Sequence, residues 1–70
     1  MKEIHIKTDF IKLDSFLKLC GEAATGGEAK KLILNGSVKI SGEICYQRGK
    51  KISSGTEICV NENEYKVIKE

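Results

Sequence analysis

The sequence predicts an α+β fold in which two short helices pack on a small, mainly antiparallel β-sheet. Two segments, within residues 12–20 and 25–35, space their apolar residues three and four positions apart, as one face of a helix requires. Most of the remaining chain alternates apolar and polar residues in short stretches, as half-buried strands do. With 40% apolar residues and no proline, residues 1–70 have the composition of one small folded domain with a thin core.

The first part of the chain combines a strand with a helix. Ile4 and Ile6 alternate with polar neighbours and predict a short opening strand. The helix that follows ends at Gly21, because glycine is favoured just after the last helical residue. Asp14 and Lys18 are four residues apart on its flank, a spacing that allows an ion pair. The apolar face of this helix consists of Leu13, Phe16, Leu17 and Cys20.

The second helix has signals at both of its ends. Thr25 and Glu28 have the spacing of a capping box, in which the Thr25 hydroxyl accepts from the Glu28 amide and the Glu28 carboxylate returns to the Thr25 amide. The pair Asn35-Gly36 ends the helix. Because each residue turns a helix by about 100°, Lys31 points away from the core and Lys30 lies on the flank. The predicted buried face consists of Ala29, Leu32 and Ile33.

The second half of the chain supplies the sheet on which these helices must dock. Val38 and Ile40 alternate with polar residues, and Ser41-Gly42 suits a tight turn into a strand over residues 43–46. A basic loop over residues 47–51 comes next. Two further strands are expected over residues 57–60 and 64–69, with turns at residues 53–56 and 61–63.

The positive charge of the chain is concentrated in its middle third. The whole chain carries a net charge of +2, whereas residues 30–51 carry a local net charge of +5 between slightly acidic flanks. A localised basic block on a folded unit is typical of proteins that bind phosphate groups. A solvated face with lysines placed for solubility is the alternative that the pattern leaves open. The basic residues of the block are Lys30, Lys31, Lys39, Arg48, Lys50 and Lys51.

Few residues have the arrangement that catalysis or metal binding requires. Cys20, Cys45 and Cys59 lack the spacing and the histidine partners of a zinc site, so free thiols in a reducing cytoplasm are expected. The only histidine, His5, lies in the first predicted strand with no nucleophile near it in the sequence. No P-loop motif occurs, and no apolar run approaches the length of a membrane span. We therefore predict a protein that is not an enzyme and needs no metal or cofactor.

Several short motifs follow one another between Lys12 and Ile58. They are Lys12-Leu13-Asp14, Thr25, Ala29-Lys30-Lys31-Leu32-Ile33, Val38-Lys39-Ile40-Ser41-Gly42 and Gly55-Thr56-Glu57-Ile58. This ordered set resembles the S-four RNA-binding domain, also called the αL motif. The segments Gly26-Gly27-Glu28-Ala29-Lys30 and Arg48-Gly49-Lys50-Lys51 further resemble its small stand-alone YaaA/YbcJ-like subgroup.

The resemblance implies binding of structured RNA, such as ribosomal or transfer RNA, through the two helices and the adjoining loop. We also expect a cytoplasmic monomer with the ribosome as a candidate partner and no membrane partner. A-form RNA is recognised mainly through its backbone and shape, which suits lysines held on rigid elements. The expected RNA-binding residues are Lys12, Thr25, Gly26, Gly27, Lys30, Lys31, Lys39, Arg48, Lys50 and Lys51.

Three positions depart from the family pattern. Gly26 stands where many members have an arginine, Ser41 replaces the turn asparagine, and Thr56 replaces the aspartate of the late turn. The bare amides of Gly26 and Gly27 at a helix N-terminus are a partial replacement for the missing arginine, because that helix end attracts anions. Close packing and the capping box explain the same glycines equally well.

Two other interpretations of the sequence stay open. Tyr46 either stacks on an RNA base or, as the more ordinary role, occupies a strand position in the sheet. The basic surface could also serve a protein-interaction adaptor that docks an acidic partner, for example on the ribosome.

Overall fold

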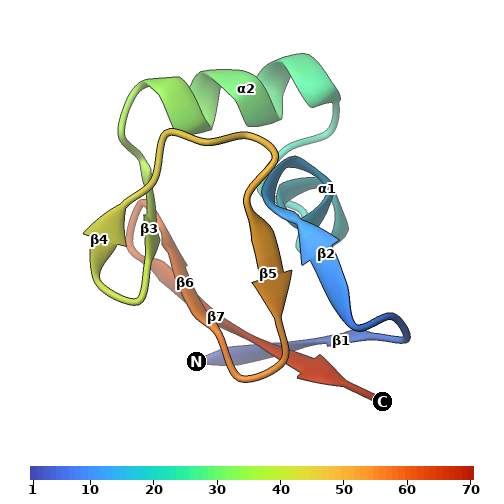
Figure 1. The fold of residues 1–70 in the computed structure, drawn as a ribbon. Helices are drawn as coiled ribbons and strands as arrows, with labels where there is room; N and C mark the ends of the chain where they lie inside the picture. Colours follow the sequence, from blue (N-terminus) through green and yellow to red (C-terminus); the bar gives the residue numbers. More distant parts are fainter.

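The computed structural model describes residues 1–70 and contains two helices and seven strands (Figure 1). Neither helix has the length and apolar character needed to cross a membrane. In chain order, the elements are β1 (Lys2–Ile6), β2 (Phe10–Lys12), α1 (Leu13–Leu19), α2 (Gly26–Leu34), β3 (Val38–Ile40), β4 (Glu43–Ile44), β5 (Lys51–Ser53), β6 (Glu57–Val60) and β7 (Asn63–Lys69).

The strands form two separate hydrogen-bonded units. A five-stranded sheet has the order β1-β7-β6-β3-β4, and the pairing of β1 with β7 is its only parallel one. Strands β2 and β5 form a separate antiparallel ribbon. The expectation of two helices on a mainly antiparallel sheet is therefore confirmed. The ribbon was not predicted from the sequence, in which Lys51 was assigned to a loop.

The helix ends follow the local signals in the sequence. Helix α1 stops before Gly21, whose φ of +86° is a conformation that glycine adopts without strain. At the start of α2, the Thr25 hydroxyl accepts a hydrogen bond of 3.2 Å from the backbone N–H of Glu28. This is the first half of the predicted capping box. The return bond from the Glu28 carboxylate is not formed.

The turns also agree with the sequence, although the strand after one of them is shorter than expected. Ser41 and Gly42 have φ angles of +51° and +87°, so this two-residue connection has the positive φ values of a type I′ hairpin turn. The strand predicted over residues 43–46 ends at Ile44, which leaves Tyr46 outside the sheet and 59% exposed. The strand position expected for Tyr46 was therefore wrong.

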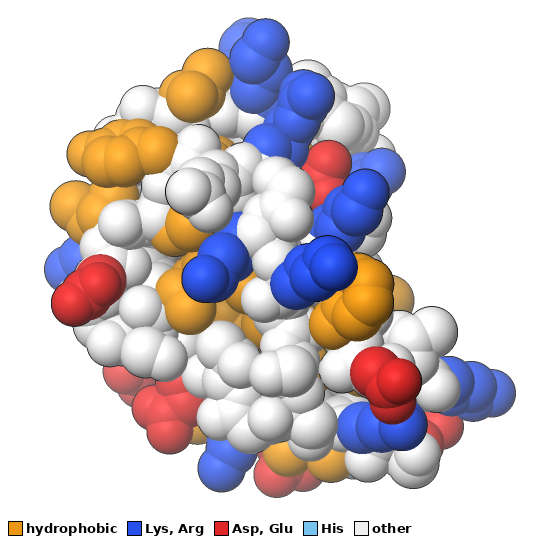
Figure 2. All heavy atoms as spheres, in the orientation of Figure 1, with side chains coloured by type: hydrophobic (Ala, Val, Ile, Leu, Met, Phe, Trp, Pro, Cys, Tyr) orange, Lys and Arg blue, Asp and Glu red, His pale blue; other side chains and the backbone are white.

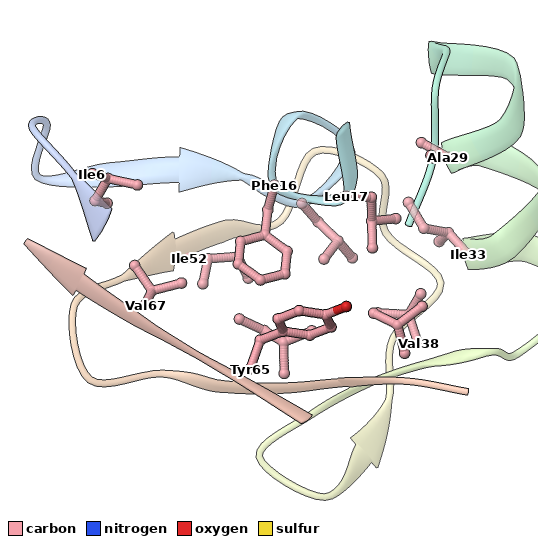
Figure 3. Packing of buried hydrophobic residues seen from close by; sticks show 13 residues of the cluster. Ile6, Phe16, Leu17, Ala29, Ile33, Val38, Ile52, Tyr65 and Val67 are labelled. Atoms are coloured by element: carbon pink, nitrogen blue, oxygen red, sulfur yellow. The ribbon is translucent and has the colours of Figure 1, made fainter. Parts of the chain in front are cut away.

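One cluster of 13 buried residues holds the helices on the sheet (Figure 3). Phe16 of α1 meets Tyr65 of β7 with the two rings edge-on and their centroids 5.9 Å apart. From α2, Ala29 and Ile33 are fully buried, whereas Leu32 is only half-buried against the edge of the cluster. The prediction that Leu32 belongs to the buried face therefore holds only in part.

A polar contact ties the segment between the helices to the last strand. The carboxylate of Glu22 accepts hydrogen bonds from the Tyr65 hydroxyl and, at 2.9 Å, from the side-chain amide of Asn63. The hydrogen bond from the Tyr65 hydroxyl to Glu22, together with burial, raises the pKa of Tyr65. The protonated hydroxyl is therefore part of the folded structure.

The raised pKa of Tyr65 predicts a loss of stability in alkaline solution. Below the usual tyrosine pKa of about 10, Tyr65 is protonated in both the folded and the unfolded chain, so its contribution to stability is fully present. Above that pH the unfolded chain releases the proton first, and the free energy of unfolding falls. We expect urea unfolding between pH 8 and pH 11.5 to show this fall.

The Tyr65→Phe variant, which has no hydroxyl to ionise, should lose the part of the alkaline dependence that begins near pH 10, while the raised pKa of the Cys20 thiol still contributes. The exposed Tyr46 provides the matched control, because Tyr46→Phe should keep the wild-type pH profile. Identical profiles for Tyr65→Phe and the wild type would show that the Tyr65 hydroxyl does not control alkaline stability.

Candidate nucleic-acid interface

The exposed side of α2 places two lysines above two bare amides. Lys30 and Lys31 lie one helical turn after Gly26 and Gly27, and all four residues are exposed. Long helical side chains lean towards the N-terminus of their helix, so both lysines extend back over the first turn. The Thr25 hydroxyl caps the amide of Glu28, which leaves the amides of Gly26 and Gly27 without a hydrogen-bond partner.

The space around Gly26 and Gly27 shows whether close packing requires glycine at these positions. A Cβ atom added at Gly26 would meet nothing within 4 Å, and one at Gly27 would meet only the Thr25 hydroxyl oxygen at 3.8 Å. Neither glycine has a positive φ. Close packing within the protein therefore does not require glycine at either position.

The β2–β5 ribbon brings two more lysines together. Lys12 and Lys51 are directly opposite each other in the register of the ribbon, and both are exposed. Like charges in opposite positions on two strands repel each other. The Nζ atom of Lys51 lies 4.8 Å from the centre of the Phe10 ring, a cation–π contact that orients the side chain. Neither lysine forms an ion pair, so the two opposed charges favour an anionic ligand.

The loop between β4 and β5 carries the remaining cations and is fixed to the start of α1. The backbone N–H of Leu13 donates to the Lys50 carbonyl at 2.9 Å, and that of Asp14 donates to the Arg48 carbonyl at 3.2 Å. Within the loop, the Lys50 amide donates to the Gln47 carbonyl at 3.2 Å. These bonds hold the backbone of Arg48 and Lys50 beside Lys12 and its partner in the ribbon.

We call the exposed cations of these three elements the basic surface. Figure 2 shows Lys and Arg side chains over α2, the β4–β5 loop and β5, whereas most of the acidic side chains on this face lie towards its lower edge. No member of the basic surface forms an ion pair. By contrast, Lys69 is paired with Asp9. The basic surface consists of Lys12, Lys30, Lys31, Arg48, Lys50 and Lys51.

Lys39 does not belong to this surface. In β3, Val38 is fully buried beneath the helices, so the alternation of the strand directs Lys39 to the opposite face of the sheet. There it lies in one row with Cys59 of β6 and Glu64 of β7. The structure therefore brings together six of the seven cations expected to bind RNA and separates Lys39 from them.

The remaining reactive side chains lie outside the basic surface. No three His, Cys, Asp or Glu residues lie close enough together to hold a metal ion. Burial raises the pKa of the Cys20 thiol, which makes it a poor nucleophile at neutral pH. The Nε2 atom of His5 lies 3.8 Å from the Oε1 atom of Glu3, and both residues are in the exposed edge strand β1. Asp14 accepts from the Ser15 amide and does not form the ion pair with Lys18 that their spacing allowed.

Two features of the site were missed in the sequence. Phe10 carries the cation–π contact, and its signal was the alternation of Phe10-Ile11-Lys12, where Ile11 packs against the core. The pairing of Lys12 with Lys51 had no local signal, because the two residues are far apart in the chain and each strand has only three residues.

Comparison with known proteins identifies relatives of this fold. The family model described as S4 domain matches residues 4–68. The solution structure of YbcJ from E. coli, described as revealing an αL motif involved in RNA binding, is 28% identical, with a TM-score of 0.74 over 97% of this chain and 87% of YbcJ. No relative was found among curated protein sequences.

A second solved structure shares the fold within a larger protein. The 30S ribosomal protein S4e from Thermoplasma acidophilum is 22% identical, with a TM-score of 0.65. The likeness covers 86% of this chain but 32% of S4e, and at this level of identity it concerns the fold alone.

Proposed function

The chain belongs to the S4 domain family, and on that premise we propose that it is a non-catalytic protein that binds structured RNA through its basic surface. The observation that carries the proposal is a set of six exposed cations on α2, the β4–β5 loop and the β2–β5 ribbon, none of which forms an ion pair. Backbone hydrogen bonds join the loop to the junction of β2 and α1. The αL motif reported as involved in RNA binding in YbcJ supports the same ligand.

The chemistry of the basic surface suits the phosphate backbone of an RNA helix. Lysines act as point charges toward phosphate, and the Arg48 guanidinium can bind one phosphate through two hydrogen bonds. The amides of Gly26 and Gly27 add donors at the positive end of the α2 dipole. A-form RNA displays its backbone and the wide minor groove, so recognition by shape and charge needs no deep groove contact. Lys39, on the other side of the sheet, would add only long-range attraction.

The proposal includes the cellular setting expected from the sequence. Ribosomal or transfer RNA is the proposed RNA class, with the ribosome as a candidate assembly, the cytoplasm as the location and a monomer as the binding form. Residues 1–70 act as one S-four-like RNA-binding domain in this proposal.

Salt dependence provides the test of the basic surface. Binding of a 20-base-pair RNA hairpin should weaken steeply as salt rises, because each neutralised phosphate releases counterions and adds about 0.7–0.9 to the log–log slope. Lys30→Ala and Arg48→Ala should each weaken binding and lower the slope by roughly that amount. Fluorescence anisotropy at several salt concentrations measures both quantities.

Lys69→Ala is the matched control, because it removes the same charge from a residue that Asp9 already neutralises. It should leave the affinity and the slope near the wild-type values. Equal losses from Lys69→Ala and Lys30→Ala would contradict a defined basic surface. Failure to bind any RNA, with salt-dependent capture of an acidic protein instead, would favour the adaptor.

The glycines at the start of α2 allow a second test with two opposite readouts. Since a Cβ fits at Gly26 and Gly27, the variant Gly26→Ala/Gly27→Ala should be more stable, by up to about 0.4–1 kcal/mol for each site, because alanine restricts the unfolded chain. If the two amides bind a phosphate, the added methyl groups obstruct it and the affinity for the hairpin falls. Urea unfolding and anisotropy measure the two effects in the same samples.

An alanine variant that is more stable and binds RNA as tightly as the wild type would exclude these amides from the interface. Thr25→Ala separates the two roles of this helix end, since it should lower stability by removing the cap of Glu28.

A further inference from the structure

An exposed tyrosine lies in a hollow beside the basic surface. The hollow has a volume of about 530 Å³, and its lining includes Tyr46, Gln47, Lys50, Glu43, Ile44 and Ile40. Tyr46 is 59% exposed and Ile44 48% exposed, although neither position needs an apolar residue for the core. Exposed apolar side chains gathered in one place are typical of binding sites.

The Tyr46 side chain is held at the end of α2. Gly36, just beyond the helix, has a φ of +81°, and a Cβ built there would lie 3.7 Å from the Tyr46 hydroxyl oxygen. The tyrosine therefore rests against a backbone position that has no side chain. Its own loop is fixed at its other end by the hydrogen bonds from Leu13 and Asp14. Because the loop is fixed at that end, Tyr46 is kept beside the hollow.

The hollow and the basic surface share one residue and one loop. Lys50 lines the hollow and is also a member of the basic surface, and Arg48 stands between Lys50 and Gln47 in the chain. A polynucleotide whose phosphates lie on the basic surface can therefore reach the hollow with an adjacent nucleotide. Continuity with a cationic surface favours a nucleic acid over an uncharged ligand.

Apart from Lys50, the charged and amide side chains of the hollow suit a base better than a phosphate. The carboxylate of Glu43 repels a phosphate but accepts hydrogen bonds from the amino groups of bases. The side-chain amide of Gln47 can donate to and accept from the edge of a base. Sequence-dependent contacts to RNA usually involve unpaired bases stacked on aromatic side chains.

We propose that Tyr46 stacks on an unpaired base of the RNA, with Gln47 and Glu43 at the edge of that base. The inference rests on the proposed function and adds to it the class of RNA, namely a helix that carries a bulged or terminal unpaired nucleotide. Tyr46 is a specificity residue in this account, and the basic surface supplies most of the affinity.

Two RNA hairpins with the same stem test the inference, one fully paired and one with a single 2-aminopurine bulge. The wild type should bind the bulged hairpin more tightly and quench its fluorescence, because stacking quenches 2-aminopurine. Tyr46→Ala should lose at least about fivefold in affinity for the bulged hairpin, together with the quenching, and should bind the paired hairpin as the wild type does. Tyr46→Phe should retain both properties.

Two control variants make each failure distinguishable. Leu34→Ala removes an exposed apolar side chain of equal exposure, 59%, outside the lining of the hollow, and should change neither affinity. Lys30→Ala should weaken binding of both hairpins. If Lys30→Ala does so while Tyr46→Ala affects neither hairpin, or both equally, stacking is overturned and the proposed function stands. If the wild type binds neither hairpin, the proposed function fails and the inference fails with it.

Discussion

The hydrogen bonds between the start of α1 and the β4–β5 loop position four of the six cations of the basic surface. The first amides of a helix have no partner within it. Here the amides of Leu13 and Asp14 are satisfied by the carbonyls of Lys50 and Arg48, which come from a distant part of the chain. The same residues lead into the β2–β5 ribbon. One junction therefore closes a helix end, fixes a loop and places four cations beside one another.

Some features of the basic surface lower the stability of the fold slightly. Lys12 and Lys51 repel each other across the ribbon, and the glycines at the start of α2 lower the stability of that helix without a packing reason. Features that lower stability without any gain elsewhere in the protein are common where a ligand binds. A polyanion would remove the repulsion and occupy the free amides.

The sequence predicted the parts of the fold that depend on neighbouring residues. The cap at Thr25, the helix stop at Gly21 and the turn at Ser41-Gly42 each rest on a local conformational preference, and all three were correct. The β2–β5 ribbon was missed because an alternation over three residues is too short to predict a strand. The strand position expected for Tyr46 was also wrong, because β4 ends at Ile44.

The site was predicted less completely than the fold. Basic residues that are close together in the sequence do not all lie on the same surface of the folded chain. The middle third of the chain contains Lys39, which alternation beside the buried Val38 places on the far face of the sheet. Lys12 lies outside the middle third of the chain, but the pairing of β2 with β5 places it opposite Lys51. Two things decide which lysines share a surface: the face of the sheet to which each strand residue points, and the pairing of strands that are distant in the sequence. Both depend on the packing of the core.

In the proposed function, RNA contacts one face of the molecule, formed by α2, the β4–β5 loop and the β2–β5 ribbon. Nuclear magnetic resonance of the ¹⁵N-labelled chain, titrated with a structured RNA hairpin, tests this claim residue by residue. The account predicts that the amide signals of Gly26, Gly27 and residues 48–51 shift, while those of Lys39, Cys59 and Glu64 stay in place. Shifts confined to the β3–β6–β7 face, with Gly26 and the loop unaffected, would contradict it.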